Sequence, residues 1–245
     1  MPHLAPPTLT AAEQKTILRV TAANVRDHAI FSMALGTGLR LAELVGLDVG
    51  DVFAPDGTPR VRVRIRPEIG KGGRAADVFL PDRLVTKLRR FWRWKRDRRE
   101  DLAPSAPLFC NQSRRRISRR RVQFAWRTWQ QKAGFDRLYP FHCLRHSAVT
   151  AVYRATHDLF LAQRLARHVS PLTTVVYTHP DDEGMPARYR DVLVLYYFND
   201  ADVEEAARCL GIPEGTVKAR LHRGRALLER RLEAVAHPRR TAEAT

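Results

Sequence analysis

The sequence predicts an α+β fold that is mainly α-helical, with one small antiparallel β-hairpin, followed by an all-α helix-turn-helix domain. Three observations support this prediction. Over most of the chain, apolar residues recur at helical spacing between capping residues and glycines. Residues 60–81 instead alternate apolar and basic residues. Near the C-terminus, two amphipathic segments flank a turn at residues 211–213, which is typical of a helix-turn-helix.

Three helices are expected at the start of the chain. Residues 8–21 contain Thr10 and Glu13 in the spacing of a capping box, in which each side chain binds the backbone N–H of the other residue. Residues 25–35 form a second helix, ended by the stretch GTG, and residues 39–47 continue as a third.

The change to an alternating pattern predicts a β-hairpin. The apolar positions are Val61, Val63, Ile65, Val78 and Phe79. The alternation breaks at the stretch GKGG, so Lys71 is expected at or near the hairpin tip. An exposed face made of arginines is suited to lie against phosphates, although a half-exposed sheet explains the alternation equally well.

Further helices are expected beyond the hairpin. Residues 83–101 and 113–134 predict two strongly basic helices, and the second contains six arginines within residues 114–121. A helix begins near His142, another near Asp158, and a third follows Ser170 and Pro171, a suitable N-cap and first-turn pair. A charge run of this kind is as often a solvated face as a binding surface.

The C-terminal part reads as a separate helical domain. We expect a first domain at residues 1–181, a linker at 182–184, a helix-turn-helix domain at 185–235 and a flexible tail at 236–245. The inner contacts of the helix-turn-helix are expected from Ala207, Leu210, Ile212, Val217 and Leu221.

Charge and cysteine content narrow the function classes. The 43 basic and 26 acidic residues give a net charge of +17, typical of a nucleic-acid-binding protein. Residues 1–184 hold most of the excess, with 32 basic and 17 acidic residues. The sequence has no membrane-length apolar run or secretory signal, and its three scattered cysteines fit a reducing cytoplasm. No Cys/His pattern indicates a metal site, so we expect no metal and no cofactor.

The first candidates for an anion-binding or catalytic role are His142 and Arg145. They share one face at a helix start, where backbone N–H groups favour an anion. Alone, such a pair is a weak signal, because chance and core histidines explain most pairs of this kind. Arg40, which follows a glycine turn and precedes Glu43 by three residues, strengthens the interpretation of His142 and Arg145 as functional residues. Lys71 follows on the hairpin. His168 then comes nine residues before Tyr177.

Taken in this order, the motifs resemble the catalytic domain of the tyrosine recombinases, the phage integrase family, over about residues 8–181. The resemblance implies the recombinase fold for the first domain and the catalytic set Arg40, Lys71, His142, Arg145, His168 and Tyr177, with Glu43 as a supporting acid. It implies that Tyr177 attacks a DNA phosphate, which both arginines bind, and that Lys71 protonates the leaving 5′-hydroxyl. The product is a 3′-phosphotyrosyl link.

Residues 185–232 resemble region 4 of sigma factors, the module that reads a promoter element. The resemblance implies that the second helix enters the major groove, with Glu214, Thr216, Lys218, Arg220 and Arg223 as candidate contacts. It also raises a contact with RNA polymerase through this domain. In the plainer interpretation, the segment is a generic DNA-binding or packing appendage. From the basic run we add Arg114, Arg115, Arg116, Arg119, Arg120 and Arg121 as candidate DNA contacts.

Two functions follow from these patterns. The first is a site-specific DNA recombinase or integrase that acts on double-stranded DNA as a homo-oligomer. The second is a DNA-binding or transcription-regulating protein that uses the recombinase fold as a scaffold, favoured by the sigma-like segment and by the expected lack of the family's separate N-terminal clamp domain. A type IB topoisomerase is a related third function. One departure from the family pattern is Arg167, where a glycine usually precedes the third-motif histidine.

Overall fold

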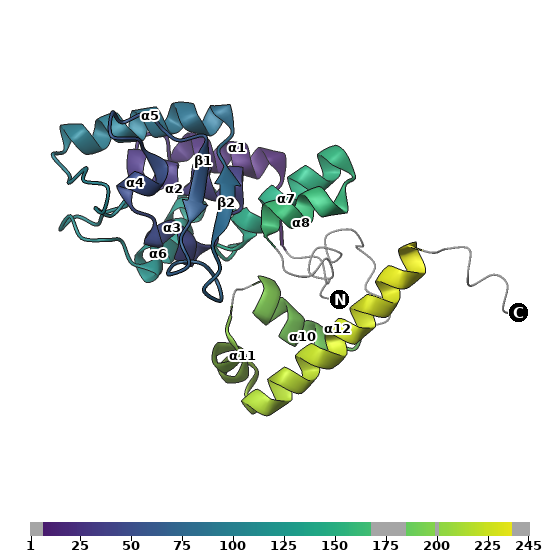
Figure 1. The fold of residues 1–245 in the computed structure, drawn as a ribbon. Helices are drawn as coiled ribbons and strands as arrows, with labels where there is room; N and C mark the ends of the chain where they lie inside the picture. Colours follow the sequence, from purple (N-terminus) through teal and green to yellow (C-terminus); the bar gives the residue numbers. More distant parts are fainter. Residues whose placement is uncertain (1–6, 168–184, 199–200, 237–245) are drawn as a thin grey trace, which may run out of the picture. The chain divides into compact units, whose positions relative to one another are not determined.

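The computed structural model describes residues 7–167, 185–198 and 201–236 (Figure 1). These residues divide into two compact units, residues 7–148 and the described residues from Val149 onward, and each unit is described separately below. His168, the helix expected after Ser170, Tyr177 and the linker at 182–184 lie outside the described residues.

The first unit begins with three helices, as predicted. They are α1 (Ala11–Val20), α2 (Val25–Thr37) and α3 (Leu41–Gly46). The capping box of α1 is present, because the Glu13 amide donates to Thr10 Oγ1 at 3.1 Å and the Thr10 amide donates to Glu13 Oε2 at 2.7 Å. The predicted start of the chain's first helix is therefore confirmed.

The end of α2 differs slightly from the prediction. The helix continues through Gly36 and ends at Gly38, whose φ of 63° places it in the left-handed region that glycine adopts without steric cost. Gly36 lies inside the helix, at a place where α5 packs closely against it. A Cβ there would lie 3.3 Å from the Leu84 side chain.

The predicted hairpin is confirmed. Strands β1 (Arg62–Ile65) and β2 (Ala76–Phe79) pair antiparallel, and the loop between them carries Lys71. Val63, Ile65 and Val78 are buried, as the alternation requires. Val61 departs from the pattern. It is 65% exposed, and Phe79, also among the predicted apolar positions, is 66% exposed.

Two basic helices follow the hairpin, α5 (Asp82–Asp97) and α6 (Arg119–Lys132). The prediction that the second begins at residue 113 is wrong. Ser118 is its N-cap, accepting from the Arg121 amide at 3.2 Å. The preceding residues form a turn in which Arg114 has a φ of 59°, so only three of the six arginines lie on the helix. The short helix α4 (Val49–Val52) was not predicted.

The core of the first unit lies between these helices and the hairpin. Helix α2 contacts α1, α3 and α5, while β1 contacts α4. Trp126 of α6 lies edge-on to Phe31 of α2, with the ring centroids 5.1 Å apart. The indole Nε1 donates to the carbonyl of Tyr139 at 2.8 Å, which holds the segment leading to His142 against the core.

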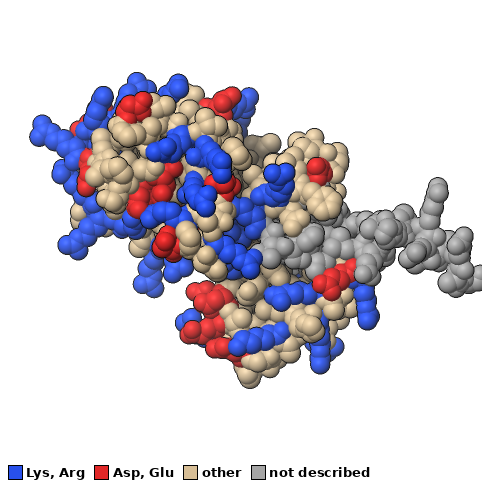
Figure 2. Space-filling view, in the orientation of Figure 1, with Lys and Arg blue, Asp and Glu red and all other residues tan. Residues whose placement is uncertain are grey.

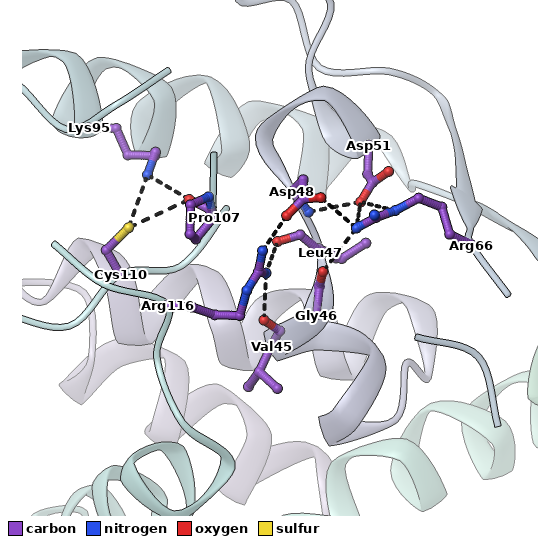
Figure 3. A network of polar contacts seen from close by, with 10 residues as sticks. All are labelled: Val45, Gly46, Leu47, Asp48, Asp51, Arg66, Lys95, Pro107, Cys110 and Arg116. Atoms are coloured by element: carbon purple, nitrogen blue, oxygen red, sulfur yellow. Dashed lines mark hydrogen bonds and ion pairs between the residues drawn. The ribbon is translucent and has the colours of Figure 1, made fainter. Parts of the chain in front are cut away.

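A buried ion pair closes the C-terminal end of α5. Lys95 Nζ lies 2.9 Å from a carboxylate oxygen of Glu100, and both side chains are buried. The ammonium also approaches the carbonyl of Pro107 and the sulfur of Cys110 (Figure 3). These contacts connect α5 to the segment that precedes the arginine-rich turn.

A pH dependence of stability is expected from His28 on α2. Burial, with the charges of Lys87 and Arg90, lowers the pKa of His28 to about 4. The unfolded chain titrates near pH 6.5, so between those values it binds the additional proton and the folded state loses stability as the pH falls. We expect about 1–2 kcal/mol from this group, less than the full linkage value because the ring is only half-buried.

The variant His28→Gln tests this expectation. Urea unfolding at about pH 7 and about pH 4.5 should show a smaller loss of stability in the variant than in the wild type. An equal loss in both proteins would contradict the assignment.

The second unit contains the end of α7 (Cys143–Thr156), the helix α8 (Leu159–Ala166) and the C-terminal helices. Asp158 caps α8, as predicted, by accepting from the Leu161 amide at 3.0 Å. Arg167 ends α8 with a φ of 52°, a conformation that favours glycine. A glycine, which is usual at this position in the family that the sequence resembles, would suit the backbone that the arginine adopts here.

The C-terminal helices are α10 (Ala187–Leu193), the π-helical turn η1 (Val194–Phe198), α11 (Val203–Leu210) and α12 (Glu214–Ala236). Gly211 ends α11 in the left-handed region with a φ of 63°. Val217 and Leu221 of α12 are buried, and Ala207, Leu210 and Ile212 pack against the same cluster. The predicted inner contacts of the helix-turn-helix are thus confirmed, and the expected domain boundaries stay a prediction.

The predicted fold class is also confirmed. The described elements are helical apart from the two-stranded antiparallel sheet, and α11 with α12 forms the expected all-α motif. Within the described ranges, no helix has the length and apolar character needed to cross a membrane.

Candidate functional site

The first part of the site is the turn between α2 and α3. Gly38 ends α2 in the left-handed conformation, which turns the chain so that Arg40 stands directly before α3. From α7, Nη1 of Arg145 donates to the carbonyl oxygen of Gly38. The Arg145 residue is only 2% exposed. The two arginines, far apart in sequence, therefore lie at the same turn.

Glu43 holds Arg40 at two points. One carboxylate oxygen accepts from the Arg40 backbone amide at 2.8 Å, and the other lies 3.1 Å from the guanidinium Nη1. The side chain of Glu43 is 3% exposed and that of Arg40 is 14% exposed. The supporting role predicted for Glu43 matches this geometry, because a buried carboxylate with two such bonds fixes the orientation of the arginine.

His142 lies in the turn that begins α7 and is largely buried. Burial is the main cause that lowers the pKa of His142 well below its ordinary value, and the positive charges of Arg145, Arg40 and Lys71 lower it further. The imidazole is therefore neutral at physiological pH. The same charges show that the structure brings together Arg40, Lys71, His142 and Arg145, four of the six predicted catalytic residues.

His146 belongs to the same cluster and was not in the predicted catalytic set. Its ring centroid lies 4.6 Å from that of His142, the planes meet at 74°, and the residue is 1% exposed. The sequence carried a usable signal, since a residue four positions after His142 on a helix falls on the same face. The ring supports His142 from inside the protein.

Lys71 approaches this cluster from the hairpin loop. It is exposed, and it is followed by Gly72 and Gly73, which both have positive φ angles near 69° and 68°. No other atom lies within 4 Å of where their Cβ atoms would be. The loop backbone after the lysine is thus not packed against other parts of the chain at these two glycines.

The arginine-rich segment divides into two kinds of residue. Arg114, Arg115, Arg119, Arg120 and Arg121 are exposed. Arg116 is also exposed, but its guanidinium donates to the carbonyls of Val45 and Leu47 at 3.0 and 2.8 Å and pairs with Asp48 (Figure 3). Figure 2 shows lysine and arginine side chains spread over the visible face of the first unit. We assign Arg116 to holding the chain together and keep the other five as predicted DNA contacts.

The candidate contacts of the helix-turn-helix lie on α12. Lys218 and Arg223 are exposed, while Thr216 and Arg220 are half-buried. Lys218 lies 3.7 Å from Glu214, one turn earlier. Hydrogen bonds from Arg223 and Arg188 lower the pKa of Tyr189. Arg223 therefore already has a partner on α10, as Lys218 has in Glu214, and neither is favoured over the other as a base contact.

Among the described residues, no group of three or more His, Cys, Asp or Glu side chains is arranged to hold a metal ion. Apart from Glu43, which pairs with Arg40, the charged groups of this cluster are arginine and lysine. Two guanidinium groups and one ammonium near a neutral imidazole supply positive charge that favours an anion, and the planar guanidinium suits the paired oxygens of a phosphate.

Comparison with known proteins agrees with this chemistry. Residues 7–184 match the phage integrase family, and residues 183–228 match sigma-70 region 4. A tyrosine recombinase XerC of Haemophilus ducreyi is 35% identical over 168 residues, which are 68% of this chain and 52% of the relative. XerC of Vibrio cholerae is 34% identical over 187 residues, 75% of this chain and 57% of the relative. The chain spans about half the length of these curated relatives.

Solved structures give the same result. The crystal structure of the XerA recombinase is 26% identical, with a TM-score of 0.61, and the match covers 72% of this chain and 62% of XerA. XerH bound to its difH substrate is 26% identical, with a TM-score of 0.60 and coverage of 73% and 52%. Together with the arginine, lysine and histidine cluster, these matches show that the chain belongs to the phage integrase family, the tyrosine recombinases.

Proposed function

We propose that this protein is a site-specific DNA recombinase that breaks and rejoins DNA through a 3′-phosphotyrosyl intermediate. The observation that carries the proposal is the cluster at the turn before α3, where Arg145 donates to the Gly38 carbonyl beside Arg40 and the buried His142 lies within range of the Arg40, Arg145 and Lys71 charges. We take this cluster as the phosphate pocket, because it offers positive charge and a neutral imidazole at one place, which is what cleavage of a phosphodiester by a side-chain nucleophile requires. The relatives named tyrosine recombinase support the same assignment.

In the proposed reaction, one DNA phosphate occupies the pocket. Arg40 and Arg145 bind its non-bridging oxygens and stabilise the additional negative charge of the transition state. Glu43 keeps Arg40 in place, so little reorganisation is needed when the phosphate arrives.

Tyr177 is the proposed nucleophile. Its phenol oxygen forms a bond to phosphorus, and the bond from phosphorus to the 5′-oxygen breaks. Ionising a phenol of pKa about 10 costs about 4 kcal/mol at pH 7, so the pocket must lower this cost. The phenol proton passes to a histidine, His142 or His168, and Lys71 gives a proton to the leaving 5′-oxygen. Attack by a 5′-hydroxyl on the phosphotyrosyl link reverses these steps and rejoins the DNA.

Binding of double-stranded DNA is proposed for both parts of the chain. The exposed arginines between residues 114 and 121 bind backbone phosphates, and α12 with Lys218 adds affinity or sequence choice. Solved relatives include a λ integrase dimer on its core site and XerH on difH, so we propose that this chain also acts as a homo-oligomer on DNA. The match to sigma-70 region 4 leaves RNA polymerase contact, like a cytoplasmic location, as a prediction.

The test of this function is covalent trapping. The full chain is incubated with a pool of randomised suicide duplexes, which lose a short strand segment after cleavage and cannot be rejoined. Wild-type protein should give a denaturant-resistant protein–DNA adduct that keeps the strand on the 5′ side of the break. The Tyr177→Phe variant should give none. Tight DNA binding without any adduct would instead favour the DNA-binding scaffold function.

Binding should weaken steeply with salt, because each arginine–phosphate contact releases counterions. For six or more contacts we expect affinity to fall about 10³-fold between about 50 and 200 mM salt, as measured by fluorescence anisotropy on a short duplex. A flat response would contradict the basic-surface assignment.

The two classes of arginine provide a matched comparison. Arg115→Gln should reduce the slope of log affinity against log salt by about one. Arg116→Gln should leave the slope unchanged and lower the stability of the fold, because this side chain binds Asp48 and two backbone carbonyls. Equal slopes in all three proteins would argue against Arg115 as a phosphate contact.

A further inference from the structure

Lys71 must be held in position to donate its proton. Lys71 lies in an exposed loop, and the two glycines after it permit movement. A proton donor must nevertheless reach one oxygen atom within hydrogen-bond distance at the moment the bond breaks. The position of the residues at which the loop begins, the loop root, therefore determines how often the Lys71 ammonium lies within reach of the leaving oxygen.

Arg66, the first residue after β1, provides that root. One of its guanidinium nitrogens lies 2.6 Å from an Asp48 carboxylate oxygen and 3.1 Å from one of Asp51, while Nε donates to Asp51 at 3.2 Å. The same guanidinium donates to the carbonyl of Gly46 at 3.1 Å. We name this set, Arg66 with Asp48 and Asp51, the hairpin anchor; Figure 3 shows the carboxylates meeting the guanidinium from α4 and the residue before it.

An apolar contact lies beside the hairpin anchor. Ile69 packs directly over Gly46, the last residue of α3, and a Cβ on that glycine would lie only 2.5 Å from the Ile69 side chain. The amides of Ile69 and Gly70 also donate to the carbonyl of Arg66 at 3.2 and 3.0 Å. The chain is thus held up to the residue immediately before Lys71.

The hairpin anchor is tied to the phosphate pocket through α3. This helix has only six residues, from Leu41 to Gly46, with Arg40 before its first residue and the Arg66 contact at its last carbonyl. Arg116 braces Asp48 from the opposite side and binds the carbonyls on either side of Gly46, those of Val45 and Leu47 (Figure 3). Helix α3 therefore connects the arginine that binds phosphate with the root of the loop that carries the proton donor.

We propose that the hairpin anchor is a positioning device for Lys71, and that Arg66, Asp48 and Asp51 are positioning residues in the cleavage reaction. The inference rests on the proposed function, because it assigns these residues to the step in which Lys71 protonates the leaving 5′-oxygen. Loss of the hairpin anchor leaves the nucleophile and the phosphate contacts intact and removes the proton donor from its place.

The test compares two leaving groups in full-length protein. One suicide duplex carries the sequence selected by wild-type trapping, and the other replaces the bridging 5′-oxygen at the cleaved phosphate with sulfur. A 5′-thiol, with a pKa of about 8.5, departs as the thiolate and needs no proton, whereas an alkoxide does. Misplacement of Lys71 therefore slows cleavage of the oxygen duplex and leaves cleavage of the sulfur duplex unchanged.

We expect Arg66→Met to reduce adduct formation on the oxygen duplex about 10–100-fold and to stay within about threefold of wild type on the sulfur duplex. Arg66→Lys should recover part of the activity, since an ammonium still reaches the carboxylates without forming the fork. Equal losses on both duplexes would overturn the proposal, because they would show a general structural effect.

Three further variants control for misfolding and for charge effects. Gly46→Ala displaces Ile69 without removing a polar group and should give the same oxygen-only loss. Asp51→Asn should do so as well, whereas Asp97→Asn makes the same charge change at an exposed pair on α5 and should leave both rates unchanged. Oxygen-only losses in Asp97→Asn would overturn the assignment to the hairpin anchor.

Hydrogen–deuterium exchange provides a readout that needs no DNA cleavage. In Arg66→Met, exchange should rise at residues 66–75 and stay at the wild-type level in α2 and α5. Unchanged exchange in the hairpin loop would overturn the proposal whatever the rates show. Failure of wild-type protein to cleave either duplex would overturn the proposed function itself, and with it the catalytic part of this inference.

Discussion

Replacing Arg145 with lysine is expected to slow covalent adduct formation by about 10²–10³-fold, the usual effect of losing one preorganised donor to a transition-state oxyanion. The variant keeps the positive charge. It loses the planar fork that donates to the Gly38 carbonyl and that is proposed to bind a non-bridging phosphate oxygen as well. The residue is 2% exposed, so no neighbouring solvent replaces the missing donor.

The rate is measured from time courses of adduct formation on the selected suicide duplex, with protein in excess. Arg154→Lys, at an exposed position near the end of the same helix, is the matched control and should leave the rate unchanged. Thermal unfolding of each protein separates a loss of folding from a loss of chemistry. A folded Arg145→Lys variant with wild-type rates would contradict the placement of this guanidinium on the phosphate.

Replacing Glu43 with glutamine is expected to lower both the stability of the fold and the rate of adduct formation. The substitution leaves the Arg40 guanidinium close to other positive charges without its carboxylate partner. Removing one partner of a buried pair costs about 3–5 kcal/mol, and the slight exposure of Arg40 reduces this to about 2–4 kcal/mol. The freed guanidinium also adopts more orientations, so adduct formation should fall about 10–100-fold.

Urea unfolding gives the change in stability, and the trapping assay gives the change in rate. Glu204→Gln is the control, since it removes the carboxylate of an exposed i,i+4 pair with Arg208 and should cost less than about 0.5 kcal/mol. If Glu43→Gln and Glu204→Gln unfolded at the same urea concentration, the ion pair with Arg40 would contribute nothing to the fold.

Features set by neighbouring residues could be predicted from the sequence. The capping box of Thr10 and Glu13, the pairing of Arg40 with Glu43 and the burial of Val63 within the hairpin depend on spacings of two or three residues. The residues of the cluster were predicted from the order of the motifs along the chain. Motifs that are individually weak become specific when they follow one another in the order of a known family.

Contacts between distant segments could not be predicted. Arg116 reads as one of six similar arginines, and only the fold shows that its guanidinium reaches Leu47 and Asp48, 69 and 68 positions earlier. The hairpin anchor was missed for the same reason, since nothing in the local pattern pairs Arg66 with Asp51. The start of α6 was predicted too early, because the arginine-rich sequence favours a helix from residue 113. In the structure the chain turns at Arg114, which has a positive φ, and the helix begins only after Ser118.

The C-terminal motif was predictable in its core and less so in its surface. Burial of Val217 and Leu221 follows from helical spacing after the turn at Gly211. The engagement of Arg223 with Tyr189 does not, because it depends on how α10 and α12 pack. A sequence pattern that predicts exposed basic residues therefore identifies candidate DNA contacts. It does not show which of these side chains already contact another residue of the chain.

The central claim is that a phenol oxygen becomes bonded to the DNA phosphate that the arginine pair binds. The most direct measurement is to digest the trapped adduct with nuclease and trypsin and to identify the modified peptide by mass spectrometry. We predict that the residual nucleotide lies on Tyr177 in the tryptic peptide of residues 168–188. An adduct carried by any other residue, or the absence of an adduct in protein that binds DNA tightly, would contradict the claim.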